Sequence, residues 1–114
     1  MNTEMPYYGR AWIYRALSRS VQTTRLAPQD RRLIKLWLVR GVEAEPGSAW
    51  AYYVAAETLL EAGPLSDAEK AMVLTWLQKA AQYAPPPRHR RARVHYDVLA
   101  AELTAKYFGK GIEL

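Results

Sequence analysis

The stretch AWIY at residues 11–14 occurs again as AWAY at residues 49–52. Independently, WLVRGV at residues 37–42 occurs again as WLQKAA at residues 76–81, and a proline follows each copy, as Pro46 and Pro85. The two matches occur in the same order along the chain, and their offsets differ by a single position, which indicates an internal repeat. We therefore predict that each repeated unit is a helical hairpin.

Proline and glycine divide the rest of the chain at intervals that suit helices, and no run of alternating β-branched residues indicates a strand. Ser48 is a candidate N-cap, Gly63 a candidate left-handed turn, and Ser66 with Glu69 a candidate capping box. Short connections make successive helices antiparallel neighbours. The fold class predicted is all-α. Its five antiparallel helices are expected at about residues 6–22, 28–44, 48–62, 66–83 and 88–107.

Length and composition predict one domain over residues 1–114. The chain has no cysteine, which excludes disulfides and thiolate metal sites. Its longest stretch without a charged residue, residues 46–56, is far shorter than the roughly 18 apolar residues that indicate a membrane span. The first ten residues lack the apolar core of a signal peptide. We expect a cytoplasmic protein with no membrane contact.

Charge is unevenly distributed along the chain. Residues 1–40 carry eight basic and two acidic side chains, residues 41–79 carry two basic and six acidic ones, and residues 80–114 carry six basic and three acidic ones. This order is typical of charged patches that meet partners, or of a solvated surface whose segments attract one another.

The repeat resembles the tetratricopeptide and Sel1-like family of helical repeats. The first helix of a unit in that family carries an aromatic residue, a large-small pair and another large residue, and the second ends with a small residue before a proline. The unit is usually about 34 residues long, shorter than the period here, and Ala56 stands where glycine is usual. WLQKAA at residues 76–81 is similar to the W-x-x-K-A-A ending of Sel1-like repeats. The matching residues are Tyr52, Ala55, Ala56, Leu59, Gly63, Ala80 and Pro85.

The resemblance implies two and a half hairpins in a right-handed α-α superhelix, over about residues 7–107. Small residues would let helices approach closely, namely Gly41, Ala55, Ala56 and Ala80, and large aromatic residues would fill the core between them, namely Tyr14, Trp37, Tyr52 and Trp76. A plain five-helix bundle is the alternative. In tetratricopeptide arrays the remaining residues of each first helix line a concave groove. The implied groove residues are Trp12, Arg15 and Arg19, then Trp50, Tyr53, Glu57 and Glu61, then His89, Ala92 and Tyr96.

The family resemblance implies a non-catalytic adaptor, chaperone or assembly factor that binds a partner protein or peptide in this groove. The same surface could instead be the seam of a homodimer, because short arrays leave apolar ends. His89 and His95 lack metal-ligand spacing and a third ligand, and no phosphate loop or nucleophile motif is present, so we expect no enzyme, metal or cofactor. Nucleic acid is an alternative partner, through clustered arginines that could neutralise phosphates. These are Arg88, Arg90, Arg91 and Arg93.

Overall fold

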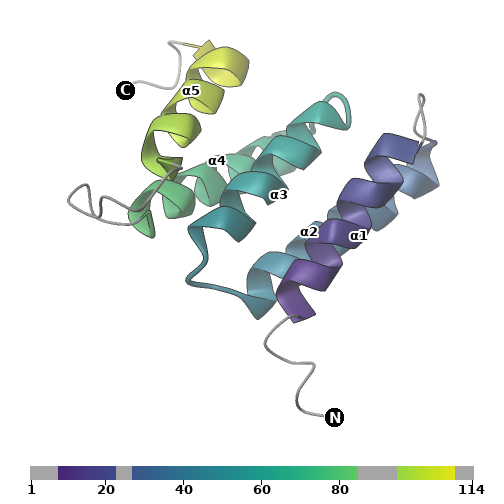
Figure 1. Cartoon of the computed structure of the whole chain (residues 1–114). Helices are drawn as coiled ribbons and strands as arrows, with labels where there is room; N and C mark the ends of the chain where they lie inside the picture. The colour runs from purple at the N-terminus through teal and green to yellow at the C-terminus, as the bar shows by residue number, and fades with distance from the viewer. Residues whose placement is uncertain (1–7, 23–26, 85–94, 110–114) are drawn as a thin grey trace.

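The chain folds as five α-helices in the computed structural model, which describes residues 8–22, 27–84 and 95–109 (Figure 1). The all-α prediction is confirmed, with no strand in the residues described. The helices are α1 (Tyr8–Gln22), α2 (Pro28–Ala44), α3 (Ala49–Glu61), α4 (Asp67–Gln82) and α5 (Tyr96–Phe108). None of these helices is long and apolar enough to cross a membrane.

The helix starts predicted from capping chemistry are confirmed for α3 and α4. The backbone N–H of Ala51 donates to the Ser48 hydroxyl at 3.1 Å, which satisfies a first-turn N–H group that has no partner within the helix. At α4 the Glu69 N–H donates to the Ser66 hydroxyl at 3.2 Å, and the Ser66 N–H donates to the Glu69 carboxylate at 3.0 Å. This is the predicted capping box, and it fixes the Glu69 side chain at the start of α4.

The last helix begins later than the sequence analysis predicts. We expected a helix from about Arg88, but α5 begins at Tyr96, and its N-cap His95 has φ −102° and ψ 89°, outside the helical region. The expected residues 88–94 lie outside the described part of the chain. At the other end the prediction is correct, because Gly109 follows α5 with φ +65°, a backbone conformation that favours glycine.

The helices pack in a regular order along the chain. α1 packs against α2, α3 packs against α4, and α5 packs against both α3 and α4. The first pair joins the second through contacts of α3 with both α1 and α2. In Figure 1, α1, α3 and α5 lie on the side towards the viewer, with α2 and α4 behind them. The first, third and fifth helices therefore share one face of the molecule.

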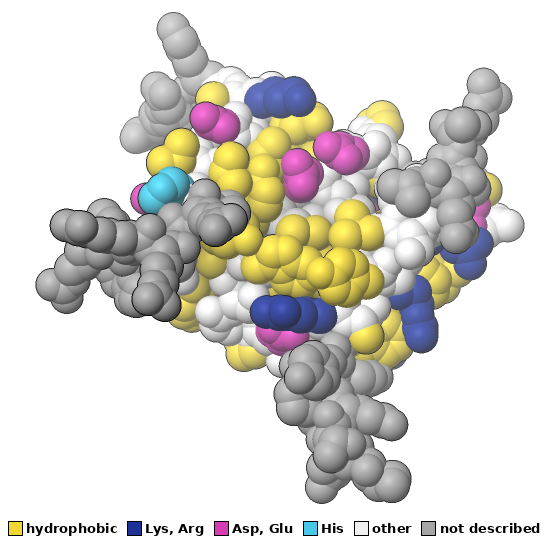
Figure 2. All heavy atoms as spheres, viewed as in Figure 1, with side chains coloured by type: hydrophobic (Ala, Val, Ile, Leu, Met, Phe, Trp, Pro, Cys, Tyr) yellow, Lys and Arg dark blue, Asp and Glu magenta, His cyan; other side chains and the backbone are white. Residues whose placement is uncertain are grey.

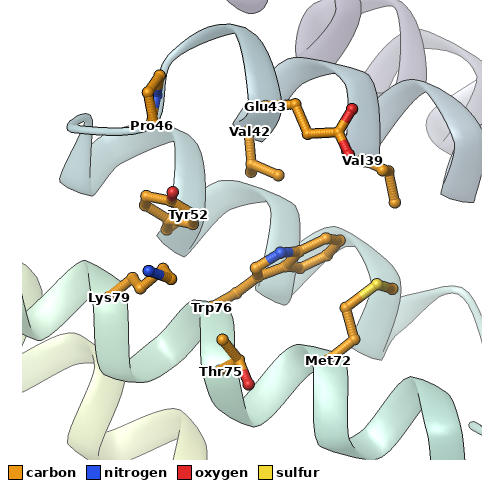
Figure 3. Close-up of a pocket in the computed structure, with 9 residues that line it drawn as sticks. All are labelled: Val39, Val42, Glu43, Pro46, Tyr52, Met72, Thr75, Trp76 and Lys79. Carbon is orange, nitrogen blue, oxygen red and sulfur yellow. The ribbon is translucent and has the colours of Figure 1, made fainter.

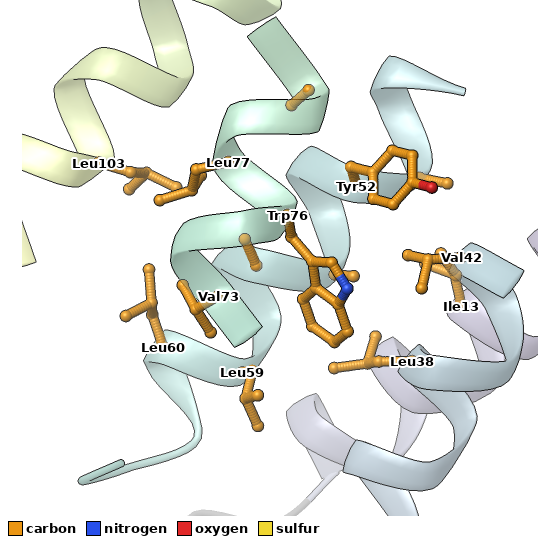
Figure 4. Close-up of a cluster of buried hydrophobic side chains, with 14 of the residues drawn as sticks. Ile13, Leu38, Val42, Tyr52, Leu59, Leu60, Val73, Trp76, Leu77 and Leu103 are labelled. Atoms are coloured by element: carbon orange, nitrogen blue, oxygen red, sulfur yellow. The ribbon is translucent and has the colours of Figure 1, made fainter. Parts of the chain in front are cut away.

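The core lies between these helices and contains the small residues picked out from the sequence. Ala55, Ala56 and Ala80 have no exposed surface, and Gly41 is also buried, so the helices meet closely at these points. The large side chains between them come from all five helices and include Ile13, Leu38, Leu59, Trp76 and Leu103 (Figure 4).

The predicted core aromatics divide into two groups. Tyr52 and Trp76 are buried, at 6% and 5% exposure, as expected. Tyr14 is 55% exposed, so its assignment to the core is wrong, and Trp37 is only half-buried. Tyr14 and Tyr52 stand at matching positions of the repeated sequence. Tyr52 lies on α3, which packs against helices that come before it and after it in the chain. α1 has no earlier helix in the described chain to cover it.

Ala80 provides a test of this packing. Ala80→Leu should lower the free energy of unfolding by about 1 to 3 kcal/mol, because added methylenes in a filled core force shifts of side chains and backbone. The measurement is chemical denaturation, with Ala81→Leu as the matched control, since Ala81 is the exposed neighbour on the same helix. An Ala80→Leu protein that unfolds together with the wild type would show that position 80 faces solvent.

Candidate partner-binding face

Four side chains form a stripe along α3, on the side of the molecule shared with α1 and α5. They are Trp50, Tyr53, Glu57 and Glu61. The spacing of three to four residues places these side chains on one side of the helix. Trp50, Tyr53 and Glu57 are half-buried and Glu61 is exposed. All four were predicted as groove residues.

Aromatic contacts connect this stripe to the helices on both sides. The ring centroids of Tyr14 on α1 and Trp50 on α3 are 5.4 Å apart, and those of Tyr53 on α3 and Tyr96 on α5 are 5.7 Å apart, both tilted. Such tilted ring pairs stabilise beyond the area they bury. The Arg10 guanidinium lies 5.5 Å from the centre of the Trp50 ring. Three helices that are distant in sequence therefore contribute to one aromatic surface.

Arg10 is held in place through its backbone as well. Its N–H donates to the Glu45 carboxylate at 3.1 Å. Glu45 follows α2 as its C-cap residue, so this bond attaches the first turn of α1 to the connection between α2 and α3. A carboxylate beside the first turn of a helix also interacts favourably with the helix dipole. The start of α1 is thereby fixed next to Trp50.

Three acidic side chains act on Tyr53, two from the same stripe and one from α5. Burial raises the pKa of Tyr53, and the negative charges of Glu57, Glu102 and Glu61 raise it further. Burial also raises the pKa of Glu57, and Glu61 adds to this effect, while Lys106 opposes it. A hydrogen bond from Tyr53 also opposes the rise, and a cation placed here would further favour the ionised form of Glu57.

Tyr96 brings α5 into this surface through its ring contact with Tyr53. Burial raises the pKa of Tyr96, and the positive charge of Arg10 opposes that rise. We call this surface the α3 face. It consists of Arg10, Tyr14, Trp50, Tyr53, Glu57, Glu61, Tyr96, Glu102 and Lys106.

Figure 2 views the molecule from this side. Hydrophobic side chains gather in a continuous patch at the centre of the view, with acidic side chains directly above it and basic side chains at its edge. Aromatic rings with charges around them are a combination that suits recognition of a protein segment.

The structure brings together only part of the predicted groove. Trp50, Tyr53, Glu57, Glu61 and Tyr96 lie on the α3 face. His89 and Ala92 lie outside the described residues, as do Arg88, Arg90, Arg91 and Arg93. Sequence reasoning missed Arg10, Tyr14, Glu102 and Lys106.

The first unit contributes different residues from those predicted. Trp12, Arg15 and Arg19 were expected in the same groove as Trp50, but Arg15 and Arg40 lie over the Trp12 ring, and Arg15 and Arg19 lie over the Trp37 ring. The reason is helical geometry. Arg10 and Tyr14 are one turn apart and both approach Trp50, so Trp12, midway between them in sequence, lies on the opposite side of α1. Residues spaced four apart, at 10 and 14, were the signal that could have identified this side.

A separate hollow lies on another part of the surface, between α2 and α4. It has a volume of about 440 Å³ and is lined by nine residues, which Figure 3 labels. Tyr52 and Trp76 lie between the two helices in this view, with Glu43 on the α2 side and Lys79 on the α4 side. None of the predicted groove residues lines it.

Within residues 8–22, 27–84 and 95–109, no group of three or more His, Cys, Asp or Glu side chains could hold a metal ion. Comparisons with models of protein families, with curated proteins and with solved structures find no match.

Proposed function

We propose that this chain is a cytoplasmic, non-catalytic binding module that holds a peptide segment of a partner protein on the α3 face. We further propose that the helices form two and a half tetratricopeptide-like hairpins. Supporting this are the repeated stretches of sequence, at 11–14 and 49–52 and at 37–42 and 76–81. The order of packing also supports it, since α1 pairs with α2, α3 pairs with α4, and α5 follows on α3 and α4.

The observation that carries the proposal is the convergence of aromatic residues from three helices on one face. Trp50 and Tyr53 are fixed by ring contacts to Tyr14 and Tyr96, yet all four keep part of their surface exposed. Rigid aromatic side chains provide contact area with little loss of conformational entropy, and they are the residues that most often dominate binding energy at protein interfaces.

The charges around the rings define the kind of peptide. Glu57, whose pKa is raised by burial and by Glu61, would be stabilised by a positive charge from a ligand. We therefore propose that the bound segment combines an apolar or aromatic anchor, lying against Trp50 and Tyr53, with a lysine or arginine that meets Glu57 and Glu61.

The test is selection of peptides from a random display library, followed by affinity measurements with purified variants. The selected peptides should combine an apolar anchor with a basic residue. Trp50→Ala and Tyr53→Ala should each weaken their binding by at least about tenfold, the range expected for an interface anchor. Trp12→Ala is the matched control and should bind as the wild type does, because Trp12 lies on the opposite side of α1.

Two results would contradict the proposal. One is a set of selected peptides that bind Trp50→Ala and Tyr53→Ala as tightly as the wild type. The other is a wild-type dimer, measured by light scattering, that Trp50→Ala converts to a monomer, since the α3 face would then be covered by a second copy.

A further inference from the structure

Arginine and tryptophan side chains alternate across α1 and α2, on the opposite side of α1 from the α3 face. The Arg40 guanidinium lies 5.4 Å from the centre of the Trp12 ring, and Arg15 lies 5.0 Å from the same ring. Arg15 also lies 5.6 Å from the Trp37 ring, and Arg19 lies 5.9 Å from it. We call this series the basic ladder, and it runs Arg40, Trp12, Arg15, Trp37, Arg19.

The basic ladder keeps much of its positive charge. Arg19 pairs with Asp30 at 3.4 Å, but within the described residues no carboxylate lies within ion-pair distance of Arg15 or Arg40, and both are exposed. Two other basic residues of α2, Arg31 and Lys35, both pair with Glu69 of α4, whereas Arg32 is exposed outside the ladder. The charge of Arg15 and Arg40 is therefore exposed on this side of α1 and α2.

The contacts with tryptophan position the guanidinium groups for an anion. An arginine over a ring is held there by the attraction between its charge and the ring, a contact that uses none of its five N–H donors. Such donors match the oxygens of a phosphate in a two-point contact. A hollow of about 240 Å³, lined by Arg15, Ser18, Arg19 and Trp37, lies beside two of the ladder's arginines.

We propose that the basic ladder binds the phosphate backbone of a nucleic acid. Arg15 and Arg40 approach the Trp12 ring from positions at most about 10 Å apart, and each would contact a phosphate. This site shares no residue with the α3 face, so it stands whether or not that face binds a peptide.

An acidic protein surface fits the ladder less well. At protein interfaces the dominant Trp, Tyr and Arg anchors lie in a desolvated centre, surrounded by contacts that exclude water. Here each tryptophan ring has two guanidinium groups over it, so the ladder offers mainly charge and little open apolar area. A surface dominated by ordered positive charge is the kind that binds nucleic acid through its backbone.

The experiment measures fluorescence anisotropy of labelled single-stranded and duplex oligonucleotides near physiological salt. Arg15→Gln/Arg40→Gln should weaken binding by at least about tenfold. It should also reduce the slope of log affinity against log salt by about 1.8 on duplex DNA or about 1.4 on a single strand, as two lost phosphate contacts require. The preferred ligand is the oligonucleotide, single-stranded or duplex, whose affinity the double substitution lowers more.

The matched control is Arg32→Gln/Lys70→Gln, which removes the same charge from exposed positions outside the ladder and should stay within about twofold of the wild type. Thermal unfolding monitors the fold of each variant, and Arg40→Gln alone replaces the double variant if that one is unfolded.

Four outcomes would overturn the proposal. The first two are absence of wild-type binding near physiological salt, and a loss in the control as large as in the ladder variant. The third is equal affinity for polyglutamate, which would assign the ladder to acidic proteins. The fourth is binding that Arg90→Ala/Arg91→Ala/Arg93→Ala abolishes and the ladder variant keeps, which would assign nucleic-acid binding to the other arginine cluster.

Discussion

Trp76→Ala should lower the free energy of unfolding by about 3 to 5 kcal/mol, the usual cost of truncating a large buried aromatic side chain. Trp76 is 5% exposed and lies in the core between α2 and α4, near Leu38 and Val42 (Figure 4). Removing the indole would join the empty space to the neighbouring hollow that Trp76 already lines, and the methyl group of alanine could not restore the lost contacts.

Denaturant unfolding followed by far-ultraviolet circular dichroism provides the measurement, because the other tryptophans complicate fluorescence. Trp50→Ala is the matched control, since it removes the same side chain from a half-buried position and should cost clearly less. Equal losses for the two variants would show that Trp76 contributes no more to the core than a surface residue does.

Local chemistry explains why most helix ends were predictable from the sequence. The capping box at Ser66 and Glu69 involves only residues three apart, and the cap at Ser48 and the glycine after α5 are equally local. No distant contact is needed to form these features. The start of α5 was missed because basic residues after a run of prolines are compatible with a helix by propensity alone, which is a weak guide to where a helix begins.

The face that each helix presents was harder to predict than the helix itself. Trp12 and Trp50 stand at matching positions of the repeated sequence, but the two residues have different neighbours in the structure. α3 packs against helices before and after it, whereas among the described helices α1 packs only against α2 and α3. Trp12 consequently contacts arginines, and Arg10 and Tyr14 take the place expected for it.

Contacts between the two hairpins could not be predicted from sequence spacing. Arg31 on α2 and Glu69 on α4 are 38 residues apart in the sequence, and local spacing predicts for Glu69 only its capping box with Ser66. Their pairing depends on how one hairpin sits on the other. Because this ion pair is largely buried, its loss should cause the second large decrease in stability that we expect.

Glu69→Ala should lower the free energy of unfolding by about 3 kcal/mol at neutral pH, because breaking a largely buried ion pair leaves its partners without compensation. The Arg31 guanidinium donates to both carboxylate oxygens of Glu69 at 3.1 Å, and Lys35 lies 3.3 Å away. Glu69 also accepts the Ser66 N–H in the capping box. Asp67→Ala is the matched control, an exposed acid in the same first turn, and should cost well under half as much.

The pH dependence of stability isolates the charge of Glu69. The hydrogen bonds from Arg31 and then from Ser66 lower the pKa of Glu69 from 4.5 to about 2. A carboxyl group whose pKa is lower in the folded state stabilises the fold fully above its unfolded pKa, and this contribution is lost as pH falls from about 4.5 to about 2. Over that window Glu69 should account for about 2 to 3 kcal/mol of lost stability.

Glu69→Gln keeps the shape of the side chain and removes its titration. The wild type should therefore be more stable than Glu69→Gln at neutral pH, and the difference should shrink as pH falls to about 2, where half of the Glu69 carboxyl groups are protonated in the folded state. Subtracting the two curves, measured by denaturant unfolding, cancels the other carboxyl groups, including Glu57, whose raised pKa acts in the opposite direction. A difference that stays constant across this range would mean that the Arg31 pair does not lower the pKa of Glu69.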